Sequence, residues 1–200
     1  AVKPQQMEAV LKEIRPSLTD KKLLLSIAAG ISTRWLEQRA GRRIRVIRAM
    51  PNLGALAGKG GAAWTLGRWS RSQDRSIARK ILAGSACVVE EVPERWMDAV
   101  TALSGSGPAY FFLLMEQMVE AGVQLGLSRK VAQRLVVGTA QGAAALMVRS
   151  QQTPKQLRKK VTSKGGTTQA ALNVFHRGAL EKTLKQGIQA AAKRAKELGR

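Results

Sequence analysis

The sequence has little of what a disulfide framework or a metal centre requires. It contains one cysteine, Cys87, and one histidine, His176. A lone cysteine forms no disulfide within the chain, and one cysteine with one histidine does not supply the clustered ligands of a zinc site. We therefore predict no metal site. Cys87 is expected to be a small buried apolar residue, and His176 a surface or helix-capping residue.

Aromatic residues and long apolar runs are also scarce. Aromatic residues make up 4% of the chain, so a single-stranded nucleic acid would find few rings on which to stack its bases. The longest unbroken apolar run, near Phe111, is far shorter than the roughly 20 residues that span a bilayer. The first residues lack the pattern of a secretory signal. We expect a cytoplasmic protein that does not enter a membrane.

Acidic residues are few compared with basic ones. Asp and Glu number 13 against 34 Lys and Arg, which gives a formal net charge of +21. A charge of this size attracts nucleic acid and other polyanions without sequence specificity. The basic residues are spread through amphipathic segments, so they indicate either solvated basic faces or a polyanion partner. Both interpretations stay open for the basic segment KQLRKKVTSK at residues 155–164.

Strand-like and helix-like segments alternate over the first 92 residues. Strand patterns occur at residues 22–27, 44–50, 62–66 and 86–89, and helical spacing at residues 5–15, 32–39 and 72–82. This alternation predicts a parallel sheet with covering helices. The opening residues Ala1 to Pro4 are typical of the end of a further strand.

Beyond Pro93 the hydrophobic spacing is helical throughout. Helices are predicted at residues 94–103, 108–125, 128–149, 155–161, 167–175 and 180–198. Residues 109–115 are apolar on every side, which predicts a helix that is buried on every side, in part by a second copy of the chain. Ser104 to Gly107 predicts a turn between helices, with Ser106 as the N-cap of the next one. We therefore predict a sheet domain at 1–92 and a helical domain at 93–200.

Ligands of open parallel sheets bind at the carboxyl ends of the strands. Here those ends are residues 2–4, 28–30 and 50–52, and each carries small residues or turn formers that let backbone approach a ligand. The sequence GKGGAA at residues 58–63 matches G-x-G-x-x-A, but it precedes a strand and does not join a strand to a helix. It predicts a glycine-rich turn, so a phosphate-binding strand–loop–helix unit is missing from the sequence.

Five segments, taken in order, resemble the pyrroline-5-carboxylate reductase family. They are AVKP at 1–4, AAG at 28–30, VIRAMPN at 46–52, DAVTALSGSGPAY at 98–110 and VTSKGGTT at 161–168. The resemblance implies an NAD(P)H-dependent oxidoreductase of proline biosynthesis, which reduces 1-pyrroline-5-carboxylate to L-proline. It also implies a partial Rossmann-like α/β domain, a helical dimerisation domain and a homo-oligomer.

The resemblance assigns residues to two parts of a site. NADP or NAD would lie against Ala1, Val2, Lys3, Pro4, Ile27, Ala28 and Ala29. The substrate would lie against Glu94, Ser163, Gly165, Gly166, Thr167 and Thr168. Thr168 is the implied catalytic residue, because its hydroxyl can hydrogen-bond the ring nitrogen, and amides at a helix start can hold a carboxylate. Two plainer interpretations stay open: Thr167 and Thr168 as helix caps, and Glu94 as a first-turn helix acid.

The sequence departs from the family pattern at several positions. Lys159 stands where the family has Asp, Lys164 where it has Pro, and Leu53-Gly54 where it has Thr-Pro. With the glycine loop also missing, we expect little or no activity from these 200 residues alone. Two alternatives follow: a non-catalytic basic relative that binds nucleic acid or another polyanion, and a structural dimerisation module.

Overall fold

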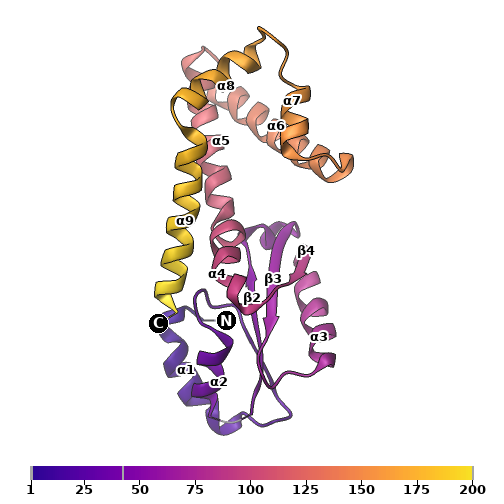
Figure 1. Ribbon diagram of the computed structural model, residues 1–200, viewed down its shortest axis with the longest axis vertical. Coiled ribbons are helices and arrows are strands. Elements are labelled where there is room, and N and C mark those ends of the chain that lie inside the picture. The colour runs from indigo at the N-terminus through magenta and orange to yellow at the C-terminus, as the bar shows by residue number, and fades with distance from the viewer. Residues whose placement is uncertain (1, 42, 200) are drawn as a thin grey trace. The chain divides into compact units, whose positions relative to one another are not determined.

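The computed structural model describes residues 2–41 and 43–199, so the predicted cofactor residue Ala1 lies outside the described residues. Contacts divide the chain into two compact units (Figure 1). The first comprises residues 1–108 and 187–200, and the second comprises residues 109–186. The domain boundary predicted near residue 92 rests on a change in the hydrophobic period of the sequence. The division by contacts falls elsewhere, after residue 108, so the boundary at residue 92 stays a prediction.

The first unit contains a four-stranded sheet in the order β1-β2-β3-β4. The strands are β1 (Leu23–Ser26), β2 (Arg45–Pro51), β3 (Gly60–Leu66) and β4 (Ala86–Glu91). The helices of the described residues are α1 (Met7–Ile14), α2 (Thr33–Ala40), α3 (Ser72–Ala83), α4 (Met97–Val100), α5 (Gly107–Gln124), α6 (Arg129–Ser150), α7 (Pro154–Lys160), α8 (Thr167–Arg177) and α9 (Leu180–Leu198). Each predicted segment therefore forms an element close to its expected bounds, apart from the opening residues: Val2 and Lys3 have no regular structure.

Local chemistry sets several helix ends. Ser32 caps α2 by accepting a hydrogen bond from the Trp35 amide, and α2 ends at Gly41, whose φ of 77° is left-handed. Ser128 caps α6 in the same way. A short polar side chain before a helix and a glycine after it satisfy backbone groups that the helix itself leaves unpaired. These ends were therefore predictable from sequence.

The sheet is mostly parallel, as predicted, but one pair of strands departs from the prediction. Strand β1 pairs with β2 in parallel and β3 with β4 in parallel, but β2 and β3 are antiparallel. The reason lies in the short connection after Pro51. Asn52 accepts hydrogen bonds from the amides of Gly54 and Gly61, and Gly58 turns the chain with a φ of 64°. A connection this short reverses the chain, whereas a parallel crossover needs a dozen or more residues.

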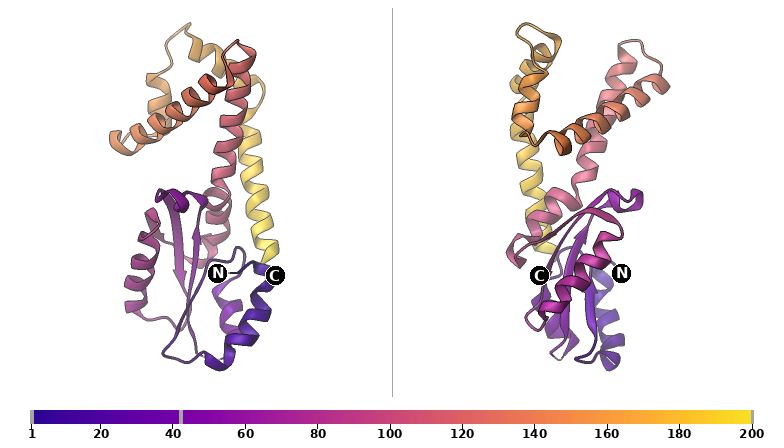
Figure 2. Two further views of the ribbon diagram at one scale, coloured as in Figure 1. Left: turned by 180° about the vertical axis from the view of Figure 1, so that it is seen from behind. Right: turned by 90° about the vertical axis from the view of Figure 1, so that its right-hand side faces the viewer.

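The sheet is covered by helices on both faces (Figure 2). Alternate residues of β2 point to opposite faces, as the pleat requires. Val46 belongs to a buried cluster with residues of α1 and α2, such as Leu11 and Leu36. Ile47 belongs to a second cluster with Trp64 and residues of α3. The core of this unit therefore lies on both sides of β2.

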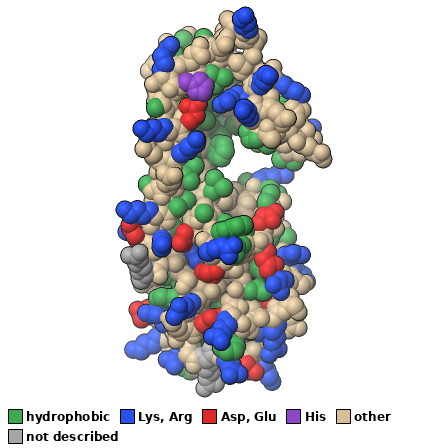
Figure 3. All heavy atoms as spheres, in the orientation of Figure 1, with side chains coloured by type: hydrophobic (Ala, Val, Ile, Leu, Met, Phe, Trp, Pro, Cys, Tyr) green, Lys and Arg blue, Asp and Glu red, His purple; other side chains and the backbone are tan. Residues whose placement is uncertain are grey.

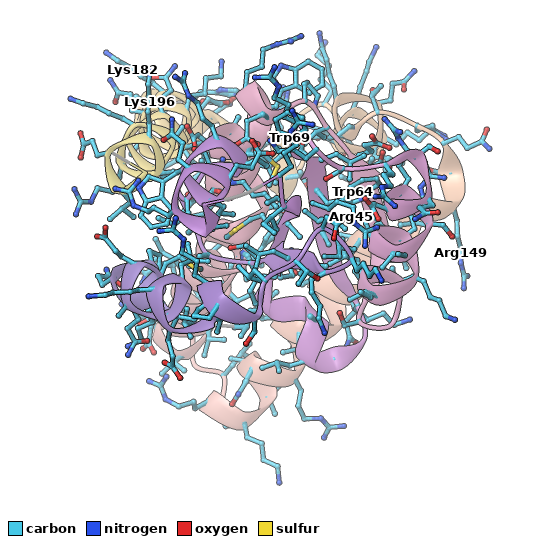
Figure 4. All side chains as sticks on the ribbon, turned by 90° about the horizontal axis from the view of Figure 1, so that it is seen from below. Arg45, Trp64, Trp69, Arg149, Lys182 and Lys196 are labelled. Atoms are coloured by element: carbon cyan, nitrogen blue, oxygen red, sulfur yellow. The ribbon has the colours of Figure 1, made fainter. Side chains whose placement is uncertain are left out.

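A buried ion pair joins β2 to α3. Arg45 and Trp64 point to the face of the sheet that α3 covers (Figure 4). Arg45 Nη1 lies 2.8 Å from Asp74 Oδ1, and the Asp74 side chain is 0% exposed. Asp74 also accepts a hydrogen bond of 2.7 Å from the Arg71 amide at the start of α3. Buried charges persist only when they are paired and hydrogen-bonded, as these are.

The segment after α4 differs from its prediction. Residues Thr101–Gly105 form a π-helical turn that leads into α5. Ser106, which was predicted to be an N-cap, has helical dihedral angles, whereas an N-cap residue is normally extended. The Ser106 amide donates to Thr101 O at 2.8 Å, which is the wide backbone bond of this turn. The predicted break between two helices is therefore a π-bulge.

The second unit exposes most of its apolar side chains. Helices α5 and α6 form a hairpin held by Arg129 and Glu120, whose Nη2 and Oε2 atoms lie 3.0 Å apart. That hydrogen bond holds the pKa of Glu120 below its usual value. Phe111 is 65% exposed and Leu113 is 59% exposed, so α5 is not buried within one chain. The expected cover by a second copy stays a prediction here.

The single cysteine of the chain lies at the surface. Cys87 is exposed, contrary to its prediction, because it lies on β4, a strand at the edge of the sheet.

Helix α6 is long and apolar enough to cross a membrane by length and composition, with a mean hydropathy of 1.2, and 11% of that stretch is buried. An interface between protein chains would present the same apolar side chains.

The Asp74→Ala variant should unfold with a free energy about 3–5 kcal/mol lower than the wild type, because it leaves the Arg45 guanidinium buried without its partner. Urea denaturation followed by circular dichroism measures this. Glu91→Gln is the matched control, since the Arg75–Glu91 pair is more exposed and should be worth about 0–1 kcal/mol. Equal losses in the two variants would contradict the assignment.

Candidate active site

The carboxyl ends of β1 and β2 meet at one edge of the sheet, because these two strands are parallel. Ile27, Ala28 and Ala29 follow β1 at this edge. Ile27 is 37% exposed and Ala28 is buried. The Ser26 hydroxyl accepts a hydrogen bond of 3.3 Å from the Ala28 amide and so fixes the turn. This edge offers a small apolar surface with accessible backbone.

Gly30 at the same edge has a structural role that the sequence did not reveal. Its φ is 80°, and a Cβ there would lie 2.9 Å from Ala195 O. Leu198 and Gly199 approach it almost as closely. Because Gly30 has no side chain, the last turn of α9 can pack directly against it. This packing accounts for the glycine without a ligand that approaches the backbone there.

Glu94 is held at the centre of a polar network within the first unit. Its Oε1 accepts from Arg48 Nη1 at 2.6 Å, and its Oε2 accepts from Thr33 Oγ1 at 2.9 Å. Arg48 Nη2 also donates to Asp98 Oδ1 at 3.3 Å. The Arg48 side chain is 4% exposed while that of Glu94 is 35% exposed. One guanidinium therefore fixes two carboxylates, and part of Glu94 stays open to solvent.

Sequence reasoning missed Arg48 and Thr33. A signal for Arg48 was available, because it interrupts the apolar strand VIRAM and a buried arginine requires carboxylate partners. Nothing in the sequence identified which carboxylates these are, since Glu94 lies 46 residues further along the chain.

The motif SGSG at residues 104–107 packs against the end of β2. Asn52 Nδ2 donates to Ser104 Oγ at 3.2 Å. A Cβ on Gly105 would collide with the Met50 side chain, and one on Gly61 would lie 3.3 Å from Ser104 Oγ. Gly105 in the motif and Gly61 on β3 thus permit a close contact between the π-helical turn and the sheet.

The loop before α8 presents a helix N-terminus. Gly166 is the N-cap, and Thr167 and Thr168 are the first two helical residues. The interpretation of these threonines as helix caps, which the sequence left open, is excluded because no side chain caps α8. The first backbone N–H groups of a helix have no intrahelical acceptor, so those of Thr167 and Thr168 have no acceptor within α8. They can hold an anion.

Hydrogen bonds within the loop hold this end in place. Gly165 has a φ of 72°, a left-handed conformation that suits glycine. Its amide donates to Gln169 Oε1 at 2.6 Å, and the Gly166 amide donates to Ser163 O at 3.1 Å. A Cβ on Gly166 would collide with Ser163 Oγ. The glycines therefore shape the turn that exposes the α8 amides.

The two unusual lysines lie beside this loop. Lys159 is exposed on α7, and Lys164 is exposed in the turn that precedes Gly165. Within residues 2–41 and 43–199, neither lysine takes part in an ion pair. Both ammonium groups are thus available to an anion in solution.

Among the described residues, no group of three or more His, Cys, Asp or Glu side chains could hold a metal ion. The expectation that the chain has no metal site stays a prediction. His176 Nδ1 lies 2.6 Å from Glu181 Oε1 on the surface of the second unit. A cavity of about 570 Å³ is lined by Thr33, Arg34, Glu37, Gln38, Arg68 and Trp69, none of which is a predicted site residue. Trp69 is labelled in Figure 4.

The predicted site residues therefore form two groups. Val2, Lys3, Pro4, Ile27, Ala28, Ala29 and Glu94 belong to the first unit, and Ser163, Gly165, Gly166, Thr167 and Thr168 belong to the second. Chemically, the first group offers an apolar surface beside a partly exposed carboxylate. The second offers backbone donors and hydroxyls suited to a small anion.

Known proteins resemble this chain over almost its whole length. A family model described as pyrroline-5-carboxylate reductase dimerisation matches residues 94–198. The pyrroline-5-carboxylate reductase of Pseudomonas aeruginosa is 42% identical over 198 residues, which cover 99% of this chain and 72% of that protein.

Solved structures show the same likeness. The Plasmodium falciparum pyrroline carboxylate reductase with NADP bound has a TM-score of 0.94 and 33% identity, covering 100% of this chain and 80% of that one. The Coxiella burnetii pyrroline-5-carboxylate reductase has a TM-score of 0.91 and 37% identity, covering 100% and 74%. Both fold and sequence are shared over nearly all of the described residues, and the chain belongs to the pyrroline-5-carboxylate reductase family.

Proposed function

We propose that the protein is an NAD(P)H-dependent reductase that converts 1-pyrroline-5-carboxylate to L-proline in the cytoplasm. The observation that carries the proposal is the loop Gly165–Thr168, which opens α8 so that the Thr167 and Thr168 amides have no acceptor within the helix, in a chain of this family. The substrate is a cyclic imine with a carboxylate, so it needs an anion site beside a donor for the ring nitrogen.

The reduced nicotinamide of NADP or NAD supplies the hydride when it is bound. Val2, Lys3, Pro4, Ile27, Ala28 and Ala29, with Ala1, are the residues we assign to it. The residues fit its nicotinamide end, because the β1 edge has small side chains and an exposed Ile27. The relative with NADP bound supports a dinucleotide in this family.

The chain's own residues orient the imine and supply charge. We assign the carboxylate to the amides of Thr167 and Thr168, where the positive end of the helix dipole favours an anion, and Gly166 lets the main chain come close to it. The Thr168 hydroxyl donates a hydrogen bond to the ring nitrogen, which becomes protonated in the product. Gly165 and Ser163 shape this loop. Glu94 acts as a positioning residue at the substrate's edge, held by Arg48.

The protein should work as a homo-oligomer. Exposed apolar residues on α5 and α6, such as Leu113 and Val137, are too numerous for a solvated surface. The segment that bears them matches the dimerisation family. We propose that a second copy covers these helices.

The activity is tested with the complete product of the gene that encodes this chain. Oxidation of NADPH and of NADH is followed by absorbance, with and without the imine. Imine-dependent oxidation that yields proline supports the proposal and shows which cofactor is preferred. A purified, folded protein that oxidises neither cofactor in the presence of the imine would defeat it.

The Thr168→Val variant should lower kcat/KM about ten- to a hundredfold, because it removes the proposed donor to the ring nitrogen while keeping the side-chain shape. Thr168→Ser should recover most of the activity. Thr183→Val, an exposed threonine on α9, is the matched control and should behave as the wild type. Equal activity of Thr168→Val and the wild type would remove Thr168 from the mechanism.

Lys164→Gln should raise the KM for the imine about two- to tenfold and leave kcat unchanged, because the ammonium attracts the carboxylate equally in the ground and transition states. Added salt should reduce the difference between the two proteins. Lys160→Gln, which also removes one exposed charge, is the control. An unchanged KM in Lys164→Gln would show that Lys164 does not contribute to substrate binding.

Leu113→Glu should convert the oligomer to a smaller species, because it buries a charge in the proposed interface. Light scattering after size-exclusion chromatography measures the mass. Leu56→Glu is the control, since Leu56 is 87% exposed in the first unit. An unchanged mass for Leu113→Glu would place the interface elsewhere.

A further inference from the structure

The second unit contains a long stretch without acidic residues. Residues 121–180 include no Asp or Glu. They include ten Lys and Arg: Arg129, Lys130, Arg134, Arg149, Lys155, Arg158, Lys159, Lys160, Lys164 and Arg177. Five of the ten fall within residues 155–164, on α7 and the turn after it. Basic side chains gather over α7 on the face drawn in Figure 3.

These side chains are free to meet a partner. Lys155, Arg158 and Lys159 lie on one face of α7, because residues three and four apart are neighbours on a helix. All three are exposed, and within residues 2–41 and 43–199 none takes part in an ion pair. We call this set of three residues the α7 basic face.

Helix stabilisation does not account for the whole α7 basic face. Cations in the last turn stabilise a helix through its dipole, which would explain Arg158 and Lys159. Lys155 lies in the first turn, where a cation is unfavourable for the same reason. Its presence there favours a partner that bears negative charge over a purely local role.

We propose that the α7 basic face binds the phosphate backbone of double-stranded nucleic acid without sequence specificity. Lysine ammonium groups on flexible stems suit phosphates as point charges. No aromatic residue occurs in α7, so bases of a single strand would have no ring on which to stack. The cations are about 5–6 Å apart at Cβ, and a duplex presents phosphates densely along its axis.

A membrane surface fits less well. A helix that lies in a membrane interface inserts an apolar face. In α7 the one large apolar side chain is Leu157, which is half-buried in the protein. Helix α7 therefore has no exposed apolar side that could insert into a membrane interface.

Fluorescence anisotropy of a labelled DNA duplex, titrated with the full-length protein at several salt concentrations, tests the proposal. We expect binding whose logarithm falls with the logarithm of salt at a slope of about −2.7 or steeper, because three phosphate contacts contribute about 0.9 each. The triple variant K155Q/R158Q/K159Q should bind more than tenfold more weakly, with a slope reduced by about 2.7. Glutamine keeps helix propensity, and circular dichroism confirms the fold.

The matched control is K12Q/R79Q/K80Q, which removes the same charge from exposed positions of the first unit. It should bind the duplex nearly as well as the wild type. An equal loss in both triple variants would show that total charge, and not the α7 basic face, drives binding. No duplex binding near physiological salt, a flat salt slope, or binding only to vesicles of anionic lipid would each overturn the proposal.

Discussion

The helices of the second unit carry more apolar surface than they can bury against one another. Among the described residues of 109–186, the apolar side chains that are buried are those of Ala132 and Val136. Burying one large apolar side chain is worth about 1.5–3 kcal/mol, so leaving those of α5 in water forfeits much of the unit's stability. The unit therefore depends on a second apolar surface. This constraint explains why residues 109–115 of α5 are apolar on every side although one chain leaves them exposed.

Elements of the first unit were predictable where the cause is local. Helix α2 begins at a serine cap and ends at a left-handed glycine, and both residues are visible in the sequence. The direction of β3 was not predictable from alternation, because the Asn52 side chain and Gly58 build a reversing turn where a crossover was expected. The π-helical turn at Thr101–Gly105 also escaped prediction. Its glycine Gly105 was interpreted as part of a break, whereas it makes room for the Met50 side chain.

Prediction of the site had a similar limit. The pattern Gly-Gly-Thr-Thr indicates a helix start, and α8 does begin there. Which residue caps it depends on dihedral angles, and Gly166 takes that place with a φ of −81°. The surroundings of Glu94 depend on pairs far apart in sequence, since Arg48 and Thr33 come from β2 and α2. A single sequence records that Arg48 needs a carboxylate but does not say which one.

The turn before α8 shows how a departure from the family pattern is accommodated. A proline at position 164 would restrict the chain before Gly165 to one region of backbone space and so preorganise the turn. Lys164 supplies no such restriction. The turn is held by other bonds, from the Gly165 amide to Gln169 Oε1 and from the Gly166 amide to Ser163 O. Since these bonds fix the residues at the start of α8, Lys164 adds charge beside the proposed anion site, and the turn keeps its geometry.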